Sequence, residues 1–142
     1  MMPRLTSLFF SICFASLVVT SPTIIVSQQG KTRAWPSGEV TCGSDVYTLD
    51  EVQAAVSAGV DHLDNPIGDN SYPHTFNNYE GLDLYCSGET DYNEYPIMSD
   101  GDAYDGDSPG ADRVIFSDNG VYCAVVTHTG ASGNDFVSCE GD

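Results

Sequence analysis

Residues 113–126 read Arg-Val-Ile-Phe-Ser-Asp-Asn-Gly-Val-Tyr-Cys-Ala-Val-Val, and this stretch decides the fold class. Two runs rich in β-branched and aromatic residues, 113–116 and 121–126, flank the turn-forming sequence Ser-Asp-Asn-Gly at 117–120. This pattern is typical of a β-hairpin with a glycine-containing turn, so we expect two neighbouring antiparallel strands. The alternating run Leu-Asp-Leu-Tyr-Cys at 82–86 predicts a further strand.

One helix is predicted ahead of this strand-rich part. Thr48 and Glu51 have the spacing of a capping box, in which the two side chains satisfy free backbone N–H groups at a helix start. Apolar and small residues then recur at helical spacing, namely Val52, Ala55, Val56 and Gly59. The sequence therefore predicts a single α+β domain, with one N-terminal helix packed on a twisted antiparallel β-sheet.

The N-terminus has the pattern of a secretory signal peptide. Arg4 supplies a positive start, and residues 8–19 form a mostly apolar run. That run is shorter than the ~20 apolar residues of a transmembrane helix. We expect a signal peptide at 1–21, cleaved near its end, and a short pro-segment at 22–33 if the basic stretch Lys31-Thr32-Arg33 is also processed. Residues 34–142 would then form a secreted, extracellular domain with no membrane segment.

Charge is distributed very unevenly along the chain. Of four basic residues, three lie in the expected leader, and all 21 acidic residues lie after position 33. Residues 34–142 thus carry one basic side chain, Arg113, against 21 acidic ones, a formal charge of −20. A single cation in so acidic a domain indicates one site that needs a permanent positive charge. Arginine is the usual choice for an oxyanion such as phosphate.

Four cysteines remain once Cys13 of the leader is set aside. An even number in a small exported chain predicts two disulfides, and four cysteines allow three pairings. We favour Cys42–Cys139, which would tie the chain ends together, with Cys86–Cys123 inside. A zinc site with four thiolate ligands would need close C-x2-C pairs, and the sequence has none.

Two histidines, a carboxylate and the lone arginine form a candidate catalytic set: His74, Glu94, Arg113 and His128. Cleavage of a phosphodiester by the neighbouring 2′-hydroxyl needs a base for the hydroxyl proton, an acid for the leaving oxygen and a cation for the phosphorane charge. These residue types can supply all three functions without a metal. On spacing alone, the alternative that the histidines are structural or merely exposed stays open.

Four motifs strengthen the catalytic interpretation through their order along the chain. They are Tyr-Pro-His-Thr-Phe-Asn-Asn-Tyr-Glu-Gly at 72–81, Asn-Glu-Tyr-Pro-Ile at 93–97, Ser-Pro-Gly-Ala-Asp-Arg-Val at 108–114 and Thr-His-Thr-Gly-Ala-Ser-Gly-Asn at 127–134. From about Cys42 to Cys139 the chain closely resembles the fungal guanyl-specific ribonucleases of the ribonuclease N/T family (T-one type). The resemblance implies a monomeric endoribonuclease of the microbial ribonuclease fold, without metal or cofactor. It would cleave single-stranded RNA to a 2′,3′-cyclic phosphate and hydrolyse this to a 3′-phosphate.

The resemblance also implies a role for each residue of the catalytic set. Glu94 would be the general base for the 2′-hydroxyl, assisted by His74 as an imidazolium, and His128 would be the general acid. The remaining members would contact the phosphate or shape the leaving-group site, namely Arg113, Tyr72 and Phe136. The peptide bond between Tyr72 and Pro73 would be cis.

The implied base-recognition segment, 76–80, makes independent chemical sense. Guanine presents a ring N–H beside an exocyclic amine, and the Glu80 carboxylate can accept both hydrogen bonds, whereas adenine lacks this pair of donors. Phe76 and Tyr79 could enclose the base, and stacking contributes about 1–3 kcal/mol per base. Backbone groups would complete the recognition at Asn77, Asn78 and Asn134. The structural alternative is an Asn-Asn turn beside two core aromatic residues.

Two other functions are compatible with a small secreted domain of this fold. A non-catalytic or toxic secreted effector on the same fold could bind RNA or a host protein, but such a protein would be expected to lose catalytic side chains, and all four are present. A ribotoxin would need long basic loops, which the single arginine argues against. The acidic stretch 100–107 does not match the spacing of a calcium-binding loop, so no metal site is expected there.

Overall fold

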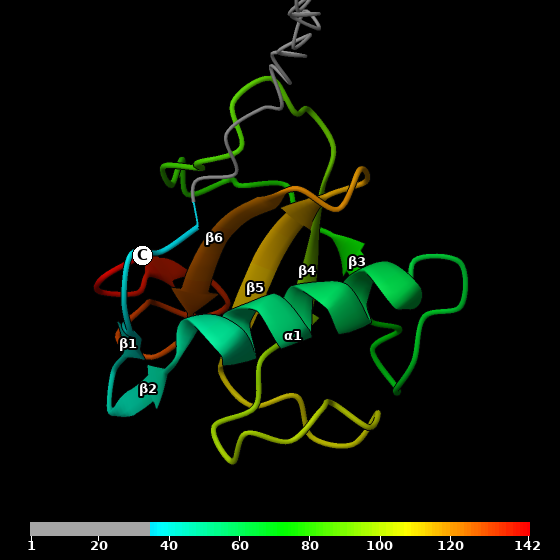
Figure 1. Cartoon of the computed structure of the whole chain (residues 1–142), viewed down its shortest axis with the longest axis horizontal. Coiled ribbons are helices and arrows are strands. Elements are labelled where there is room, and N and C mark those ends of the chain that lie inside the picture. Colours follow the sequence, from blue (N-terminus) through cyan, green and yellow to red (C-terminus); the bar gives the residue numbers. More distant parts are fainter. Residues whose placement is uncertain (1–34) are drawn as a thin grey trace, which may run out of the picture.

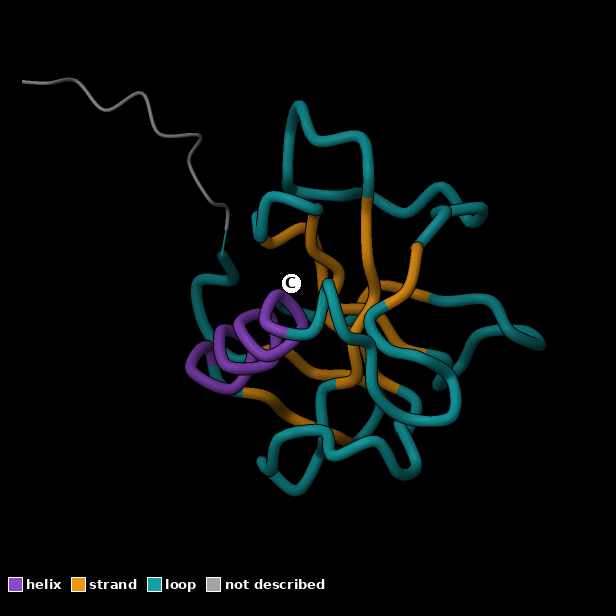
Figure 2. The backbone as a smooth tube through the Cα atoms, turned by 90° about the vertical axis from the view of Figure 1, so that its right-hand side faces the viewer, coloured by secondary structure: helices purple, strands orange, loops and turns teal. Residues whose placement is uncertain are grey.

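The structure is a computed structural model and describes residues 35–142. The predicted signal peptide and pro-segment lie outside the described residues. A small two-stranded sheet comes first, formed by β1 (Val40–Cys42) and β2 (Asp45–Tyr47). Helix α1 (Leu49–Asp61) follows and lies across one face of a five-stranded sheet (Figure 1). In the side view the helix occupies one side of the strands (Figure 2).

The main sheet has the order β3-β4-β5-β6-β7, and every neighbouring pair is antiparallel. Its strands are β3 (His74–Thr75), β4 (Tyr92–Pro96), β5 (Asp112–Ser117), β6 (Tyr122–Thr127) and β7 (Val137–Ser138). Strands β5 and β6 form the predicted hairpin, and Gly120 in its turn has a φ of 70°, a conformation that favours glycine. The predicted α+β class is confirmed.

Helix α1 begins as its sequence predicts. The Thr48 hydroxyl accepts a hydrogen bond from the Glu51 N–H (3.3 Å), and a Glu51 carboxylate oxygen accepts one from the Thr48 N–H (2.7 Å). The buried face of the helix is made by Val52, Val56 and Gly59. A Cβ atom at Gly59 would lie 2.6 Å from a ring carbon of Phe116, so glycine lets α1 approach strand β5 closely.

The prediction of a strand at residues 82–86 is wrong. The segment is extended, and its alternate residues Leu82, Leu84 and Cys86 do turn toward the core, but it pairs with no strand. The backbone N–H and C=O of Leu82 instead bond to the Asn78 side chain, and the Tyr85 N–H reaches the Cys123 carbonyl. Side-chain hydrogen bonds and a disulfide hold this segment in place of strand pairing. The alternating pattern therefore predicted correctly which residues are buried, but it did not predict that a ladder of backbone hydrogen bonds would be missing.

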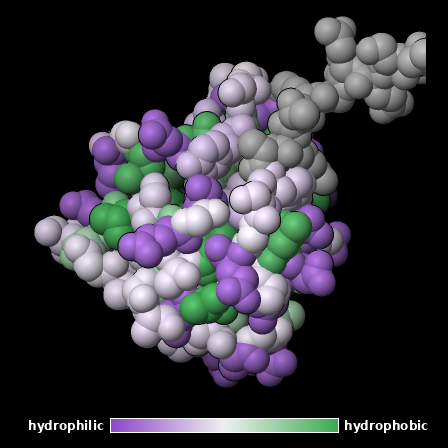
Figure 3. All heavy atoms as spheres, turned by 60° about the vertical axis from the view of Figure 1, so that its left-hand side comes forward, coloured by the Kyte–Doolittle hydropathy of each residue, from purple (hydrophilic) through white to green (hydrophobic). Residues whose placement is uncertain are grey.

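Hydrophobic residues pack on both faces of the main sheet. One cluster fills the space between the sheet and α1 and includes Val52, Tyr95, Val114 and Phe116, all at most 1% exposed. A second cluster on the opposite face contains Phe76, Ile115, Ala124, Val126 and Phe136. On the surface shown in Figure 3, hydrophilic side chains surround small hydrophobic patches. No helix among residues 35–142 is long and apolar enough to cross a membrane.

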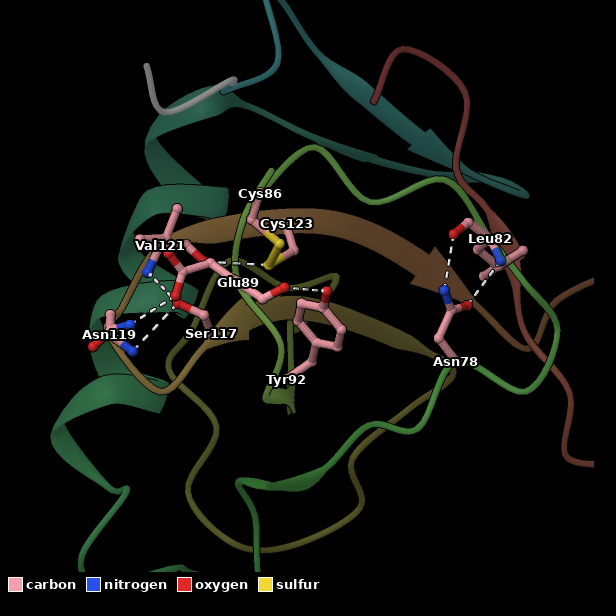
Figure 4. The surroundings of a disulfide bond; sticks show 9 residues. All are labelled: Asn78, Leu82, Cys86, Glu89, Tyr92, Ser117, Asn119, Val121 and Cys123. Carbon is pink, nitrogen blue, oxygen red and sulfur yellow. Dashed lines mark hydrogen bonds between the residues drawn. A yellow bond between two sulfur atoms is a disulfide. The ribbon is translucent and has the colours of Figure 1, made fainter. Parts of the chain in front are cut away.

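Both favoured disulfides are present. Cys42–Cys139 joins β1 to the end of the chain, where Thr41 and Glu140 also exchange two backbone hydrogen bonds of 2.8 Å. Cys86–Cys123 ties the extended segment 82–86 to strand β6 (Figure 4). The second bridge therefore anchors the chain just after the predicted base-recognition segment.

Candidate active site

Strand register brings the predicted base and its neighbours together. His74 of β3 pairs directly with Glu94 of β4, and Arg113 of β5 pairs with Pro96, two residues further along β4. Because side chains alternate along a strand, Glu94 and Arg113 emerge on the same face of the sheet. This is the face opposite α1, since Tyr95 and Val114 belong to the cluster beneath the helix. Pairing between strands that are far apart in the sequence therefore brings His74, Glu94 and Arg113 together, and the spacing of these residues in the sequence does not predict it.

Glu94 lies at the centre of this group. One of its carboxylate oxygens is 3.2 Å from Nδ1 of His74, and the other is 3.7 Å from Nε of Arg113. Only 8% of Glu94 is exposed, and this burial raises the pKa of its carboxyl to about 7, although the positive charges of Arg113 and His128 oppose the rise. A carboxyl with a pKa near neutral is suited to accept and return a proton.

Arg113 is a buried cation with a fixed orientation. It is 3% exposed, and its NH1 group donates to the carbonyls of Pro109 (3.0 Å), Gly110 (3.1 Å) and Asp112 (2.8 Å). Its NH2 group donates to the Tyr72 hydroxyl at 2.9 Å. These partners are uncharged, and they hold the guanidinium beside Glu94. The carboxylate of Glu94 approaches the guanidinium only to 3.7 Å. Such a preorganised charge can stabilise an anion.

Tyr72 and His74 form one wall of the site. The Tyr72-Pro73 peptide bond is cis, as predicted, and the two rings stack with their centroids 4.6 Å apart. Burial lowers the pKa of His74, a shift that the hydrogen bond from the imidazole to the Thr75 backbone partly opposes. The stacking of Tyr72 on His74 is a feature that the motif does not reveal. The expected imidazolium form of His74 stays a prediction.

His128 follows the last residue of β6. Its Nδ1 lies 2.8 Å from the Asp135 carbonyl, which can only accept, so Nδ1 carries the hydrogen. The His128 ring stacks on Phe136 with centroids 3.9 Å apart and an interplanar angle of 25°. These two contacts orient the imidazole and leave Nε2 for proton transfer. The charge of His128 acts to lower the pKa of Glu94, so the two predicted proton carriers lie within electrostatic range of each other.

The predicted base-recognition residues lie beside this group but differ among themselves. Phe76 is 5% exposed and packs edge-on against Phe136, whereas Tyr79 is 89% exposed. Phe76 is therefore partly a core residue, as the alternative of an Asn-Asn turn beside core aromatics predicts. Its ring meets the Phe136 ring edge-on and does not stack on it. The Glu80 carboxylate accepts a hydrogen bond from the Phe136 N–H at 3.0 Å. The two other polar members, Asn77 and Asn134, are exposed.

Asn78 has a structural contact that the sequence did not predict. Its backbone has a φ of 50°, and its side-chain amide bonds both the N–H (2.8 Å) and the C=O (2.9 Å) of Leu82 (Figure 4). The side chain therefore closes the loop that carries Tyr79 and Glu80. Asparagine tolerates the left-handed conformation and bonds nearby backbone groups, so the Asn-Asn pair was the available signal.

Other contributors to the site are backbone carbonyls, which sequence analysis missed. The Asp135 carbonyl orients His128, and those of Pro109 and Gly110 hold Arg113. Every residue has a carbonyl, so no residue type marks these roles; only the turn-forming Ser-Pro-Gly stretch before Arg113 was suggestive. Among residues 35–142, no three His, Cys, Asp or Glu side chains come together as a group that could hold a metal ion.

Comparison with known proteins is consistent with this geometry. A family model described as ribonuclease matches residues 35–140. Guanyl-specific ribonuclease T1 of Aspergillus oryzae is 52% identical over 103 residues, covering 71% of this chain and 78% of that protein. Guanyl-specific ribonuclease F1 of Fusarium fujikuroi is 47% identical over 128 residues, covering 89% and 88% respectively. Extracellular guanyl-specific ribonuclease Fl1 of Gibberella baccata is 48% identical over 101 residues, covering 70% and 93%.

Proposed function

This chain belongs to the ribonuclease family, and we propose that it is a secreted, guanine-preferring endoribonuclease that needs no metal. The observation that carries the proposal is the convergence on Glu94 of His74 at 3.2 Å and of the buried Arg113 at 3.7 Å. The names of its relatives support the guanine preference, and the extracellular relative supports secretion.

In the first step Glu94 takes the proton of the ribose 2′-hydroxyl, and the 2′-oxygen attacks phosphorus. The bond to the 5′-oxygen breaks, and Nε2 of His128 gives that oxygen a proton, so a 2′,3′-cyclic phosphate and a free 5′-hydroxyl result. The pKa of about 7 at Glu94 supports its role as base near neutral pH. His74 assists Glu94 by holding its carboxylate through the 3.2 Å contact.

The phosphate develops extra negative charge during this step. Arg113 is the only lysine or arginine after position 33, and its guanidinium, bonded to the Tyr72 hydroxyl at 2.9 Å, supplies the compensating charge. Buried, preorganised charge costs little reorganisation during the reaction. Phe136 would hold the leaving-group side of the site through its stacking on His128.

Hydrolysis of the cyclic phosphate uses the same residues in reverse. His128, now without its proton, takes one from a water molecule, and the water oxygen attacks phosphorus. Glu94 returns its proton to the departing 2′-oxygen, which gives a 3′-phosphate. Both residues end in their starting protonation states, so the protein completes the cycle without a cofactor.

Guanine is recognised next to this catalytic group. The Glu80 carboxylate accepts the ring N–H and exocyclic amine of the base, and Tyr79, at 89% exposure, closes over the exposed face of the base. Phe76 supports the other side, and backbone groups of Asn77, Asn78 and Asn134 complete the contacts. The bond from the Phe136 N–H to Glu80 supports this arrangement, because it holds one carboxylate oxygen beside the residue whose ring stacks on His128.

We propose that the mature protein is a monomer of residues 34–142, released after removal of the leader. Its substrate is single-stranded RNA, whose unstacked bases can enter such a loop. Purified protein incubated with EDTA and the dinucleoside phosphates GpC, ApC and UpC tests the proposal. We expect cleavage of GpC in preference to the other two, with the 2′,3′-cyclic phosphate appearing before the 3′-phosphate. Uncleaved GpC, or cleavage only with added divalent metal, would contradict it and would favour a non-catalytic effector.

A further inference from the structure

A cavity lies on the opposite side of the sheet from Glu94. It has a volume of about 370 Å³ and opens between the N-terminal half of α1 and the loop that leads from β4 to β5. Small and apolar residues form most of its lining, including Ala55, Ala58, Ile97 and Met98. Its size falls within the range of small-molecule sites, about 300–1,000 Å³, and is enough for a single-ring compound.

Two tyrosines belong to the wall of this cavity. Tyr95 is 1% exposed and lines it, and its hydroxyl has no hydrogen-bond partner among the described residues. Leaving a buried hydroxyl unpaired costs about 1–3 kcal/mol. The neighbouring Tyr104, which also lines the cavity, has its hydroxyl bonded to the Asp107 carbonyl at 3.1 Å. Two tyrosines therefore line the cavity beside the alanines, and an apolar body can pack against these residues.

The rim of the cavity is negative. Asp50 on α1 and Asp102 on the loop both line it, and both are exposed. The third carboxylate, Glu51, is engaged in the capping box at the start of α1. No lysine or arginine lines the cavity, and the surrounding domain is strongly acidic. Charge complementarity therefore favours a cation and disfavours an anion such as RNA.

The cavity is connected to the catalytic group through packed aromatic rings. Tyr95 meets Tyr104 edge-on at 5.7 Å, and Tyr104 meets Tyr72 edge-on at 5.7 Å. Tyr72 in turn stacks on His74 and bonds Arg113. In addition, Tyr95 is the residue next to Glu94 in strand β4. A molecule seated against Tyr95 and Tyr104 thus touches side chains that pack directly on the catalytic residues.

We propose that this cavity binds a small amphipathic amine, with its apolar body between α1 and the β4–β5 loop and its ammonium group at the rim between Asp50 and Asp102. Occupancy is coupled to the catalytic site through the three tyrosines. The binding itself does not depend on the proposed ribonuclease function, whereas the coupling rests on it.

Isothermal titration calorimetry with 2-phenylethylamine tests the binding, and phenylacetate, of similar size but opposite charge, is the matched comparison. We expect one saturable site for the amine and none for the acid. Binding of both compounds with equal affinity would overturn the cationic specificity, and absence of saturable amine binding would overturn the site.

Two pairs of variants locate the site. Ala55→Phe fills the cavity and should weaken binding at least about tenfold, whereas Ser57→Phe, which places the same ring at an exposed position of α1 outside the cavity, should not. The double variant Asp50→Asn with Asp102→Asn should weaken binding about two- to fivefold, as expected for exposed charges. Asp61→Asn with Asp64→Asn removes the same charge elsewhere and should have little effect. Equal effects within either pair would show that the amine binds the acidic surface generally.

The coupling is measured by repeating the amine titration with saturating guanosine 3′-phosphate, in about 0.5 M salt to screen direct attraction between the two ligands. Because coupling is reciprocal, the affinity of each ligand should change by the same factor, about two- to fivefold. Unchanged affinities would overturn the coupling while leaving the site intact. If guanosine 3′-phosphate does not bind at all, the proposed function fails instead, and the amine titrations still decide the cavity.

Discussion

The proposed catalytic group and the proposed base-recognition loop are built in different ways. Glu94 and Arg113 come from adjacent strands and are 8% and 3% exposed, so their surroundings are set by the whole sheet. Tyr79 comes from a loop and is 89% exposed, and its position depends on local contacts. Burial raises the pKa of Glu94, whereas exposure would let the loop meet a base. The reaction and its selectivity should therefore respond to different substitutions.

The loop is nevertheless held firmly at both ends. Asn78 bonds both backbone groups of Leu82, and the Cys86–Cys123 disulfide joins the following segment to β6. Phe136 connects the two regions, because it stacks on His128 while its N–H bonds the Glu80 carboxylate. Substitutions on either side of this junction test how separate the two regions are.

Replacing the proposed base should have the largest effect. Glu94→Gln keeps the size of the side chain but cannot accept the hydroxyl proton, so kcat/KM for GpC should fall about 10²-fold or more. Preference for guanine should persist, because Glu80 is untouched. Steady-state kinetics with GpC and ApC measure both quantities. Glu39→Gln, at an exposed position, is the control, and unchanged turnover in Glu94→Gln would remove the proposed base.

Replacing the proposed base-reading carboxylate should mainly change selectivity. Glu80→Gln removes a charge-assisted interaction worth about 1.5–3 kcal/mol, so the ratio of kcat/KM for GpC over ApC should fall about 10- to 100-fold. Cleavage of ApC itself should change little, since the catalytic strands are intact. A parallel loss on both substrates would instead show that Glu80 supports catalysis through Phe136.

The buried carboxyls predict how stability depends on pH. Burial raises the pKa of Glu94 from 4.5, and that of Asp142 from 3.8, to about 7 in each case. The folded protein therefore binds these protons more tightly than the unfolded chain, and the free energy of unfolding should fall as pH rises from about 4 to 7. The contribution of Glu94 is at most about 3 kcal/mol. Urea unfolding of the wild type and Glu94→Gln at several pH values should show a shallower decline in the variant; equal slopes would contradict the buried carboxyl.

Loosening the loop should have a smaller effect. Asn78→Ala removes the two bonds to Leu82 and places alanine at a φ of 50°, so the loop should lose its closed conformation part of the time. We expect KM for GpC to rise about three- to tenfold with little change in kcat. Asn77→Ala keeps the bonds to Leu82 and serves as comparison. A fall in kcat alone would mean that the loop positions catalytic groups.

Salt should have the smallest effect of all. A formal charge of −20 on residues 34–142 repels RNA, and salt shortens that repulsion to about 8 Å at physiological ionic strength. Cleavage of polymeric RNA should therefore rise less than about threefold, or stay level, as salt increases from very low concentrations. Initial rates over a salt series measure this, and a steep, continuous loss of activity would contradict the picture of an acidic nuclease with one buried cation.

Local signals in the sequence were sufficient for several elements. The capping box at Thr48 and Glu51 predicted the start of α1, and the Ser-Asp-Asn-Gly turn predicted the β5–β6 hairpin. The alternation at 82–86 predicted burial but not pairing, because pairing also requires a free partner edge, and Asn78 takes the backbone groups of Leu82. Phe76 was predicted as a base-stacking ring, yet its contact with Phe136 also makes it a core residue.

The chain's chemistry was determined by the sequence alone: which acids, bases and single cation are available, how the loop turns, and how many disulfides can form. Tertiary structure decided what these groups do to one another. Strand pairing set the 3.2 Å contact between His74 and Glu94, and burial moved their pKa values in opposite directions. The contact and the pKa shifts both depend on residues that are far apart in the chain. Strand pairing joins distant segments, and desolvation arises from every group packed around a side chain, whatever its position in the sequence.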